Sequence, residues 1–391
     1  MTIPPEFLSF IKAHPYPLAD GVVVPDPAST DRVLSVYVNA SSGDPSHAQQ
    51  WRTELRHAID RAEASIPLDA QMERDRFARC VLQVEQRLAD VGFRPTGPVS
   101  AMDGRPAGWM SLIATNGDVV ESRLPVAPAL HVTWGPGASI MPYLATTRTG
   151  DAVIVLVDLD NATIARLHRG TVQLLERLAA DDYVEVGPHM GDAARNGFHT
   201  GTRGETQTDA AQRQRRESQE QMLTALRRKL AVIAGSDARV VIGGSTAATA
   251  HLVATLPPSL ASRSAVSEAL GMHTPFVDIP MVAQGALLEL LTRRQLELLA
   301  TLDRRLHLTR NAAFGLESVQ AAAAAGAIEQ LLLTEAQWAR RPEATEALAQ
   351  QAMRAGAHVC VATPACAEQL DAMGAGIAAE LRFPVPLPVS V

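Results

Sequence analysis

The chain has 391 residues, a hydrophobic fraction of 47% and a formal net charge of −7. This length predicts two or three domains, and the acidic balance argues against a protein that coats nucleic acid non-specifically. No run approaches the ~20 apolar residues of a membrane span, and the three scattered cysteines form neither a disulfide framework nor a zinc motif. We therefore expect a cytoplasmic protein that requires no metal and no cofactor, with neither a membrane nor DNA as its partner.

Residues 1–147 are predicted to form an α+β domain. Val33–Ala40 is predicted to be a strand, because apolar and polar side chains alternate along it. Residues 49–91 carry apolar side chains at a spacing of three to four, which predicts one helical stretch. Asn116-Gly117 is a strong turn signal and predicts a hairpin between the strands on either side of it.

Residues 148–309 are predicted to form a second, α/β domain. Ala152–Asp158 is a continuous apolar run, typical of a central buried strand, and two more strands follow it after short turns. A polar loop is expected over residues 187–207, followed by a helix over Thr208–Ala234. The first half of that helix has no apolar face, so it must project into solvent or meet a polar partner.

The rest of this domain alternates strands and helices, which favours an α/β layer. A strand before Gly243-Gly244 should turn into a helix capped by Ser245 or Thr246. The glycine pair lacks both the G-x-G-x-x-G spacing and a P-loop lysine, so a tight turn is a better interpretation than a phosphate loop. Residues 274–281 are expected to be an edge-like strand segment, and residues 310–391 to form a third, α/β/α domain.

Charge is distributed unevenly along the chain. Arg195–Lys229 holds eight basic and four acidic residues, a net charge of +4, whereas Asn311–Val391 holds four arginines and eight acids, a net charge of −4. Glycines allow close approach to a phosphate, and arginine binds phosphates with two parallel hydrogen bonds. On charge alone a flexible solvated insertion is the favoured interpretation, and an RNA-contacting tip is the alternative, which the family resemblance given next favours. The candidate RNA-binding residues are Gly201, Arg203, Gly204, Arg213, Arg215 and Arg216.

The order of these segments resembles the archaeo-eukaryotic class-I release factor and Pelota family, in particular its bacterial members, the baeRF group. The resemblance is carried by "VIVLVDLDNATIARLHRG", the glycine-rich loop before a long helix, "VVIGGS" and "GLESVQAAAAAGAIEQLLLTE". It implies an RNase H-like middle domain and a C-terminal domain like the kink-turn-binding ribosomal proteins. It also implies a role in the ribosomal A site, in hibernation, rescue or quality control, contacting ribosomal RNA near the peptidyl transferase centre, with a translational GTPase as a further partner.

True release factors carry Gly-Gly-Gln in the loop before the long helix, and this chain departs from that pattern. The corresponding place reads Thr202-Arg203-Gly204-Glu205-Thr206-Gln207, so one glycine and a displaced glutamine are present. We therefore expect ribosome binding without peptide release. One alternative is a peptidyl-tRNA hydrolase that uses Gln207 as its catalytic residue.

A second enzymatic alternative is a metal-dependent nuclease that uses Asp158 and Asp160. One residue separates the two acids at the end of a strand, so both side chains would share a face. The segment "DLDNAT" is also rich in turn-forming residues, and a β-turn is the interpretation that we favour. A protein-binding scaffold that docks through the acidic third domain is a further, non-ribosomal alternative.

Overall fold

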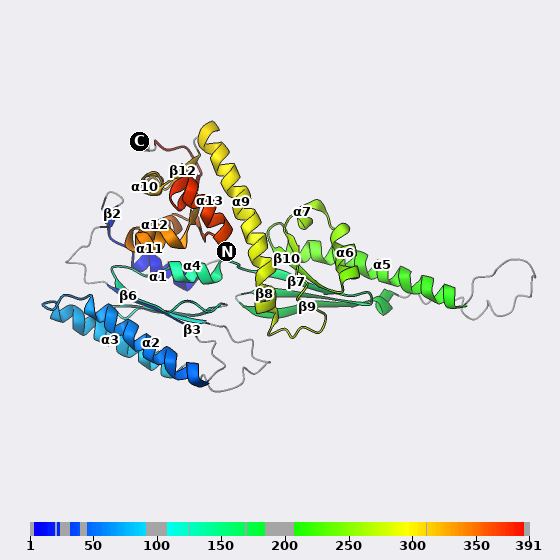
Figure 1. Cartoon of the computed structure of the whole chain (residues 1–391), viewed down its shortest axis with the longest axis horizontal. Helices are drawn as coiled ribbons and strands as arrows, with labels where there is room; N and C mark the ends of the chain where they lie inside the picture. Colours follow the sequence, from blue (N-terminus) through cyan, green and yellow to red (C-terminus); the bar gives the residue numbers. More distant parts are fainter. Residues whose placement is uncertain are drawn as a thin grey trace, which may run out of the picture. The chain divides into compact units, whose positions relative to one another are not determined.

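The computed structural model describes residues 4–19, 22–23, 32–39, 45–90, 108–124, 126–168, 170–183, 207–309 and 311–386. They form a mixed α/β protein with two compact units. The first unit comprises Met1–Gly150, Arg169–Thr171 and Leu291–Val391, and the second comprises Asp151–His168 and Val172–Leu290 (Figure 1).

The N-terminal part of the first unit is built on a four-stranded antiparallel sheet in the order β5-β4-β3-β6. Alternate residues of β3 face opposite sides: Leu34 and Val36 pack against α2 and α3, whereas Val33 and Tyr37 join the core with α1 and α4. These elements are α1 (Pro5–Ala13), β1 (Leu18–Ala19), β2 (Val22–Val23), β3 (Val33–Asn39), α2 (Pro45–Ala64), α3 (Gln71–Asp90), β4 (Gly108–Ala114), β5 (Val119–Leu124), β6 (His131–Gly135) and α4 (Met141–Thr147).

Two predictions for this part have clear outcomes. The hairpin at Asn116-Gly117 is confirmed, because β4 and β5 pair on either side of it and Gly117 adopts a φ of 97°. The single helical stretch over residues 49–91 is wrong, since α2 ends at Ala64 and α3 begins at Gln71. Pro67 lies between them and cannot continue a helical hydrogen-bond ladder.

The C-terminal part of the first unit is a mixed sheet in the order β12-β15-β13-β14, with helices packed on it. It agrees with the alternating helices and strands predicted for residues 310–391. Its elements are β12 (Ala312–Phe314), α10 (Leu316–Ala324), β13 (Ile328–Leu333), α11 (Glu335–Arg340), α12 (Pro342–Arg354), β14 (His358–Val361), α13 (Pro364–Gly374) and β15 (Ile377–Leu381).

The N- and C-terminal parts of the first unit share one hydrophobic core. Phe7, Tyr37 and Met141 cluster with Ala349 and Val361, all of them buried. The predicted segments 1–147 and 310–391 therefore contribute to a common core, and the division of the chain into three domains remains a prediction.

A buried carboxylate on α12 stabilises this shared core. Glu346 accepts hydrogen bonds from the Ser139 hydroxyl at 2.6 Å and from the backbone N–H of Ile140 at 2.8 Å and Met141 at 3.3 Å. It thus satisfies the unpaired N–H groups at the start of α4. Burial raises the pKa of Glu346 to about 7, because the loss of solvation outweighs the opposing effect of these donors.

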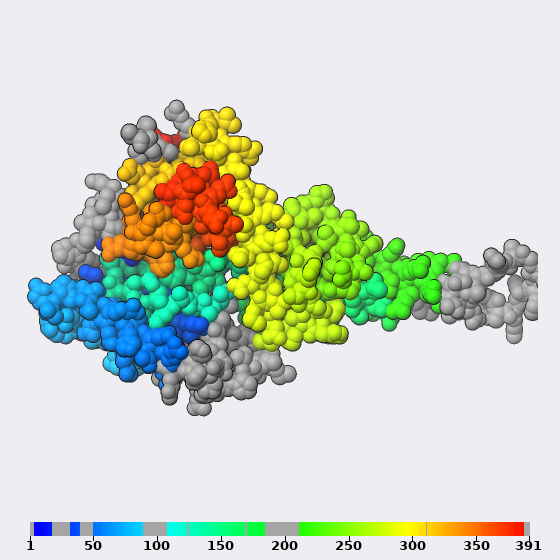
Figure 2. All heavy atoms as spheres, in the orientation of Figure 1, coloured from blue at the N-terminus to red at the C-terminus, as the bar shows by residue number. Residues whose placement is uncertain are grey.

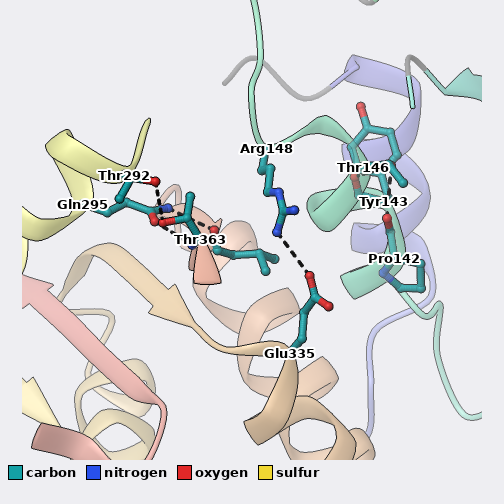
Figure 3. Close-up of polar contacts among 9 residues, drawn as sticks. Pro142, Tyr143, Thr146, Arg148, Thr292, Gln295, Glu335 and Thr363 are labelled. Carbon is teal, nitrogen blue, oxygen red and sulfur yellow. Dashed lines mark hydrogen bonds and ion pairs between the residues drawn. The ribbon is translucent and has the colours of Figure 1, made fainter. Parts of the chain in front are cut away.

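Polar contacts at another point of the first unit join distant parts of the chain (Figure 3). Arg148, just after α4, donates to Glu335 at 3.2 Å. Gln295 on α9 (Gln284–Leu308) is buried and donates to the Val361 carbonyl at 3.0 Å, while its own carbonyl accepts from Thr363 N–H at 2.8 Å. Because β14 is an edge strand, Gln295 satisfies backbone groups that have no neighbouring strand.

The second unit is a five-stranded sheet in the order β11-β10-β7-β8-β9. All six residues of the central strand β7 are buried, as its apolar run predicts. One face of the sheet packs against α5, α6 and α7, and the other against α8 and the start of α9. The elements are β7 (Ala152–Val157), β8 (Asn161–His168), β9 (Thr171–Ala179), η1 (Ala180–Tyr183), α5 (Gln207–Ala234), β10 (Arg239–Gly244), α6 (Thr246–Ala254), α7 (Pro258–Ala261), β11 (Ser264–Val266) and α8 (Ile279–Val282).

The edge strand of this sheet lies earlier in the chain than predicted. Residues 274–281 form turns and the start of α8, with Pro280 in its first turn; the edge strand next to β10 is β11, and β9 is the other edge. Two prolines in the predicted segment, Pro275 and Pro280, disfavour a strand because neither has a backbone N–H to donate.

Candidate nucleic-acid interface

The N-terminal half of α5 presents a polar stripe to its own domain. Met222, Leu226 and Leu230 are fully buried on one face of the helix. Toward the N-terminus the same face carries Ser218, which is 3% exposed, and then Arg215. These residues follow the spacing of three to four that keeps side chains on one face of a helix. The stripe is therefore apolar and buried in the second half of α5, whereas in the first half it is polar and its Arg215 side chain is 67% exposed.

The polar end of this stripe contacts Asp160 in the turn between β7 and β8. Arg215 Nη2 lies 2.5 Å from Asp160 Oδ2, and Gln219 Nε2 donates to Asp160 Oδ1 at 2.9 Å. These hydrogen bonds lower the pKa of Asp160 below its usual value, and the one from Arg215 has the largest effect. Asp160 is thus one polar partner of the first half of the helix.

Asp158 has a different role, in the turn itself. Its Oδ1 accepts the backbone N–H of Asp160 at 2.9 Å and of Asn161 at 2.6 Å. The turn favoured for this segment is therefore confirmed. Both acids of the nuclease alternative have protein partners, and the residues that the structure describes contain no group of three or more His, Cys, Asp or Glu suited to a metal ion.

The outward face of α5 consists of Arg213, Arg216, Glu217, Glu220, Thr224, Arg227 and Arg228. The N-terminal turns of this helix lie at the surface of the second unit (Figure 2). Arg213 Nε lies 3.9 Å from Glu217 Oε1, and both side chains are exposed. The Arg216 side chain is also exposed and has no partner among the described residues. A shallow hollow of about 470 Å³ lies between the two basic ends of this face, which are Arg213 with Arg216 and Arg227 with Arg228. It is lined by Tyr183, Glu217, Glu220, Gln221, Thr224, Ala225 and Arg228.

The helix is basic overall, with six basic and three acidic residues between Gln207 and Ala234. Exposed guanidinium groups can donate two parallel hydrogen bonds to a phosphate, which suits contact with an RNA backbone. The acids Glu217 and Glu220 lie between the basic ends, so the favourable contacts are concentrated at Arg213 and Arg216 and at Arg227 and Arg228.

The predicted RNA-binding residues fall into three groups. Gly201, Arg203 and Gly204 lie outside the described residues, as does most of the predicted loop 187–207. Gln207 begins α5, and its side chain is outside the described part. Arg213 and Arg216 are on the outward face, whereas Arg215 is on the inward stripe.

The contact of Arg215 and Gln219 with Asp160 was not predicted, although the sequence contains a signal for it. Arg215 and Gln219 are four residues apart, and Gln219 precedes the buried Met222 by three. Extending the apolar periodicity backwards from Met222 assigns both polar residues to the inward side of the helix.

The glycine pair after β10 is explained by close packing of the backbone. A Cβ on Gly244, where φ is 126°, would lie 1.9 Å from the Val157 carbonyl oxygen, and one on Gly243 would lie 2.3 Å from Leu270 Cβ. Ser245 occupies the N-cap position of α6, but its side chain makes no capping hydrogen bond. The tight turn predicted here is confirmed.

Comparison with known protein families identifies the C-terminal segment. Residues 294–385 match eRF1 domain 3, a match that covers the last half of α9 and the whole of the β12-β15-β13-β14 sheet. The match covers this segment alone, which is similar to eRF1 domain 3. No curated protein matches the chain.

Several solved structures are similar to the chain over most of its length. Archaeoglobus fulgidus Pelota is 15% identical, with a TM-score of 0.37, over 71% of this chain and 80% of that one. S. cerevisiae Dom34 is 15% identical, with a TM-score of 0.38, over 69% and 75%. The archaeal termination factor aRF1 is 17% identical, with a TM-score of 0.24, over 90% and 92%.

None of the described helices is both long and apolar enough to cross a membrane.

Proposed function

We propose that this protein binds the ribosome as a release-factor-like factor in rescue, hibernation or quality control. The observation that carries the proposal is the eRF1 domain 3 at residues 294–385, in one chain with an α/β unit whose long helix exposes arginines. In this proposal the A site receives the protein, and the outward face of α5 contacts ribosomal RNA toward the peptidyl transferase centre.

The strand order of the second unit supports an RNase H-like middle domain. Three antiparallel strands, β7 to β9, are followed by a long helix, and β10 and β11 then add in parallel beside β7. The predicted loop 187–207 directly precedes α5 in the sequence, and in release factors the catalytic loop also precedes a long helix. This placement supports the assignment of residues 187–216 as the RNA-contacting region.

Two observations support RNA contact by the start of α5. Arg213 and Arg216 are exposed on its outward face, and the N-terminus of a helix carries a partial positive charge that favours phosphate. The domain thus offers two guanidinium groups and a helix dipole at the same end. Because Arg215 is already paired with Asp160, the proposal assigns RNA contact to its two neighbours first.

The proposal excludes peptide release as the main activity. The sequence has no Gly-Gly-Gln, the triplet that places a glutamine beside the ester bond in true release factors. Gln207 follows Gly204 by three residues, so a glutamine is present at a different spacing. A translational GTPase is the further partner that this proposal includes.

Ribosome co-sedimentation at moderate salt tests the proposal. We expect the wild-type protein to pellet with ribosomes and the double variant Arg213→Gln and Arg216→Gln to pellet several-fold less. The variant should also depend less steeply on salt, because fewer phosphate contacts release fewer counterions. Arg304→Gln, an exposed arginine on α9, is the matched control and should pellet like the wild type. Wild-type protein that stays in the supernatant would rule the proposal out.

The same ribosomal complexes test the hydrolase alternative. Peptidyl-tRNA bound in the P site should remain intact when the protein is added. Peptide release that disappears in Gln207→Ala would replace the binding-only proposal with an enzymatic one.

A further inference from the structure

A hollow of about 350 Å³ opens in the C-terminal domain beside the start of α10. Three separate segments form it: the β12–α10 junction, the end of α11 and the turn after α13. They pack closely, since a Cβ on Gly374 would lie 2.9 Å from the Phe314 ring and one on Gly376 would lie 3.0 Å from Gln337 Cβ. The hollow is lined by Phe314, Gly315, Leu316, Glu317, Ser318, Gln337, Arg340, Arg341 and Ala375.

Two polar side chains in the lining are buried and lack partners. Ser318 is 6% exposed and Gln337 is 5% exposed. Among the described residues, neither the Ser318 hydroxyl nor the Gln337 amide makes a hydrogen bond, although Gln337 N–H donates to Thr334. The polar atoms of these two side chains are not among the fully buried atoms that lack a partner, so solvent reaches them in the hollow. A ligand in the hollow can replace that water and accept or donate the same hydrogen bonds.

The start of α10 adds further donors to the same hollow. Gly315 occupies the N-cap position with φ at 79° and has no side chain to cap the helix. The first intrahelical bond runs from Val319 N–H to the Gly315 carbonyl, which leaves the N–H groups of Leu316, Glu317 and Ser318 without a backbone partner in the described residues. Such an uncapped first turn binds an oxyanion well.

Two arginines complete the donor set at the rim. The Arg341 side chain is exposed and has no partner among the described residues, whereas Arg340 donates to Asp371 at 3.1 Å and to the Ala375 carbonyl at 3.3 Å. Two carboxylates also belong to the site: Asp371, which is paired with Arg340, and Glu317, which is exposed. Arg341 is therefore the cation available to a ligand.

We propose that this hollow binds a single phosphate group. The backbone N–H groups of the first turn of α10, the Ser318 hydroxyl, the Gln337 amide and the Arg341 guanidinium would donate to its oxygens. The hollow can hold one such group with part of the molecule that carries it. Residues 311–391 have a net charge of −4, which disfavours a polyanion and so favours a small phosphorylated molecule or a mononucleotide over an RNA chain.

Titration of the full-length protein with inorganic phosphate, followed by calorimetry or ³¹P NMR, tests the proposal. We expect saturable binding in the millimolar range, competed by sulfate. Arg341→Gln, Gln337→Leu and Ser318→Ala should each weaken the binding at least tenfold, and Arg304→Gln should not. Arg341 is exposed, so its variant tests the site without disturbing the core. Absence of saturable binding, or unchanged binding in Arg341→Gln and Gln337→Leu, would overturn the proposal.

Two further arms identify the source of the phosphate group. Tighter binding of AMP than of inorganic phosphate would support a nucleotide, and equal affinities would support a phosphate recognised alone. A single-stranded RNA that binds at this site more tightly than AMP would overturn the preference for a small ligand. The Arg341→Gln variant should lose phosphate binding but still pellet with ribosomes. The phosphate titration therefore tests this site, and the co-sedimentation tests the proposed ribosome binding separately.

Discussion

Arg215 contacts both carboxylate oxygens of Asp160, although 55 residues separate the two in the chain. The contact assigns one member of the arginine cluster to the fold of its own domain. Arg213 and Arg216, two residues before and one after, lie on the outward face of the same helix. A cluster that is uniform in sequence thus has two roles in the structure.

This division predicts that neighbouring arginines will behave differently on substitution. Arg216→Gln should weaken ribosome co-sedimentation several-fold, because its guanidinium is available to a phosphate. Arg215→Gln should weaken it less and should instead increase amide hydrogen exchange over the first turns of α5, where it removes the contact with Asp160. Equal loss of ribosome binding in both variants, with no change in exchange, would contradict the assignment of roles.

The buried Glu346 predicts a pH dependence of stability in the first unit. Its pKa is raised from 4.5 to about 7 in the folded protein, so the native state holds a proton that the unfolded chain has lost. The free energy of unfolding should therefore fall as the pH rises from about 4.5 to about 7, by up to ~3 kcal/mol, and level off above. All four tryptophans, Trp51, Trp109, Trp134 and Trp338, belong to this unit, so tryptophan fluorescence during urea unfolding measures it selectively.

Glutamine substitutions distinguish the contribution of Glu346 to the pH dependence of unfolding from that of other carboxylates. Glu346→Gln should flatten the pH dependence between 4.5 and 7, because the amide does not titrate. Glu343→Gln, an exposed residue on the same helix, should leave it unchanged. A wild-type unfolding free energy that rises across this range would show that the three donors at Ser139, Ile140 and Met141 outweigh burial.

Gln295 is expected to stabilise the edge of the C-terminal sheet. Gln295→Met keeps the approximate volume but leaves the Val361 carbonyl and the Thr363 N–H without the partners that the glutamine provides. We expect a loss of ~1–3 kcal/mol in the free energy of unfolding, measured by the same tryptophan fluorescence. Thr301→Val, at a more exposed site on α9, should cost much less.

Gly244 is expected to tolerate no side chain. In Gly244→Ala the new methyl group would meet the Val157 carbonyl oxygen, and the residue would have to keep a φ of 126°, which disfavours any Cβ. Strain of this kind exceeds the ~1 kcal/mol of a typical substitution, and circular dichroism should show a lower unfolding temperature. Gly285→Ala, where nothing lies within 4 Å of the new atom, is the control and should leave the unfolding temperature nearly unchanged.

Local patterns predicted the elements of this protein well. The apolar run of β7, the hairpin at Asn116-Gly117 and the long helix before Ala234 all depend on residues that are close in the chain. The spacing of apolar residues and the presence of turn-forming residues predict such local elements directly. The two errors, the helical stretch across Pro67 and the edge strand at residues 274–281, both lie at prolines, which interrupt helices and strands because they have no backbone N–H.

The sequence by itself determined which segments form strands and helices and which faces of them are apolar, because these properties follow from short-range periodicity. Only the tertiary structure decided that Glu346 meets Ser139, that Asp160 meets Arg215, and that Ser318 and Gln337 line one hollow. Each of these contacts joins polar side chains from distant segments. A polar residue has the same local pattern whether it faces water, a buried partner or a ligand, so its role is fixed only when the sheets and helices pack.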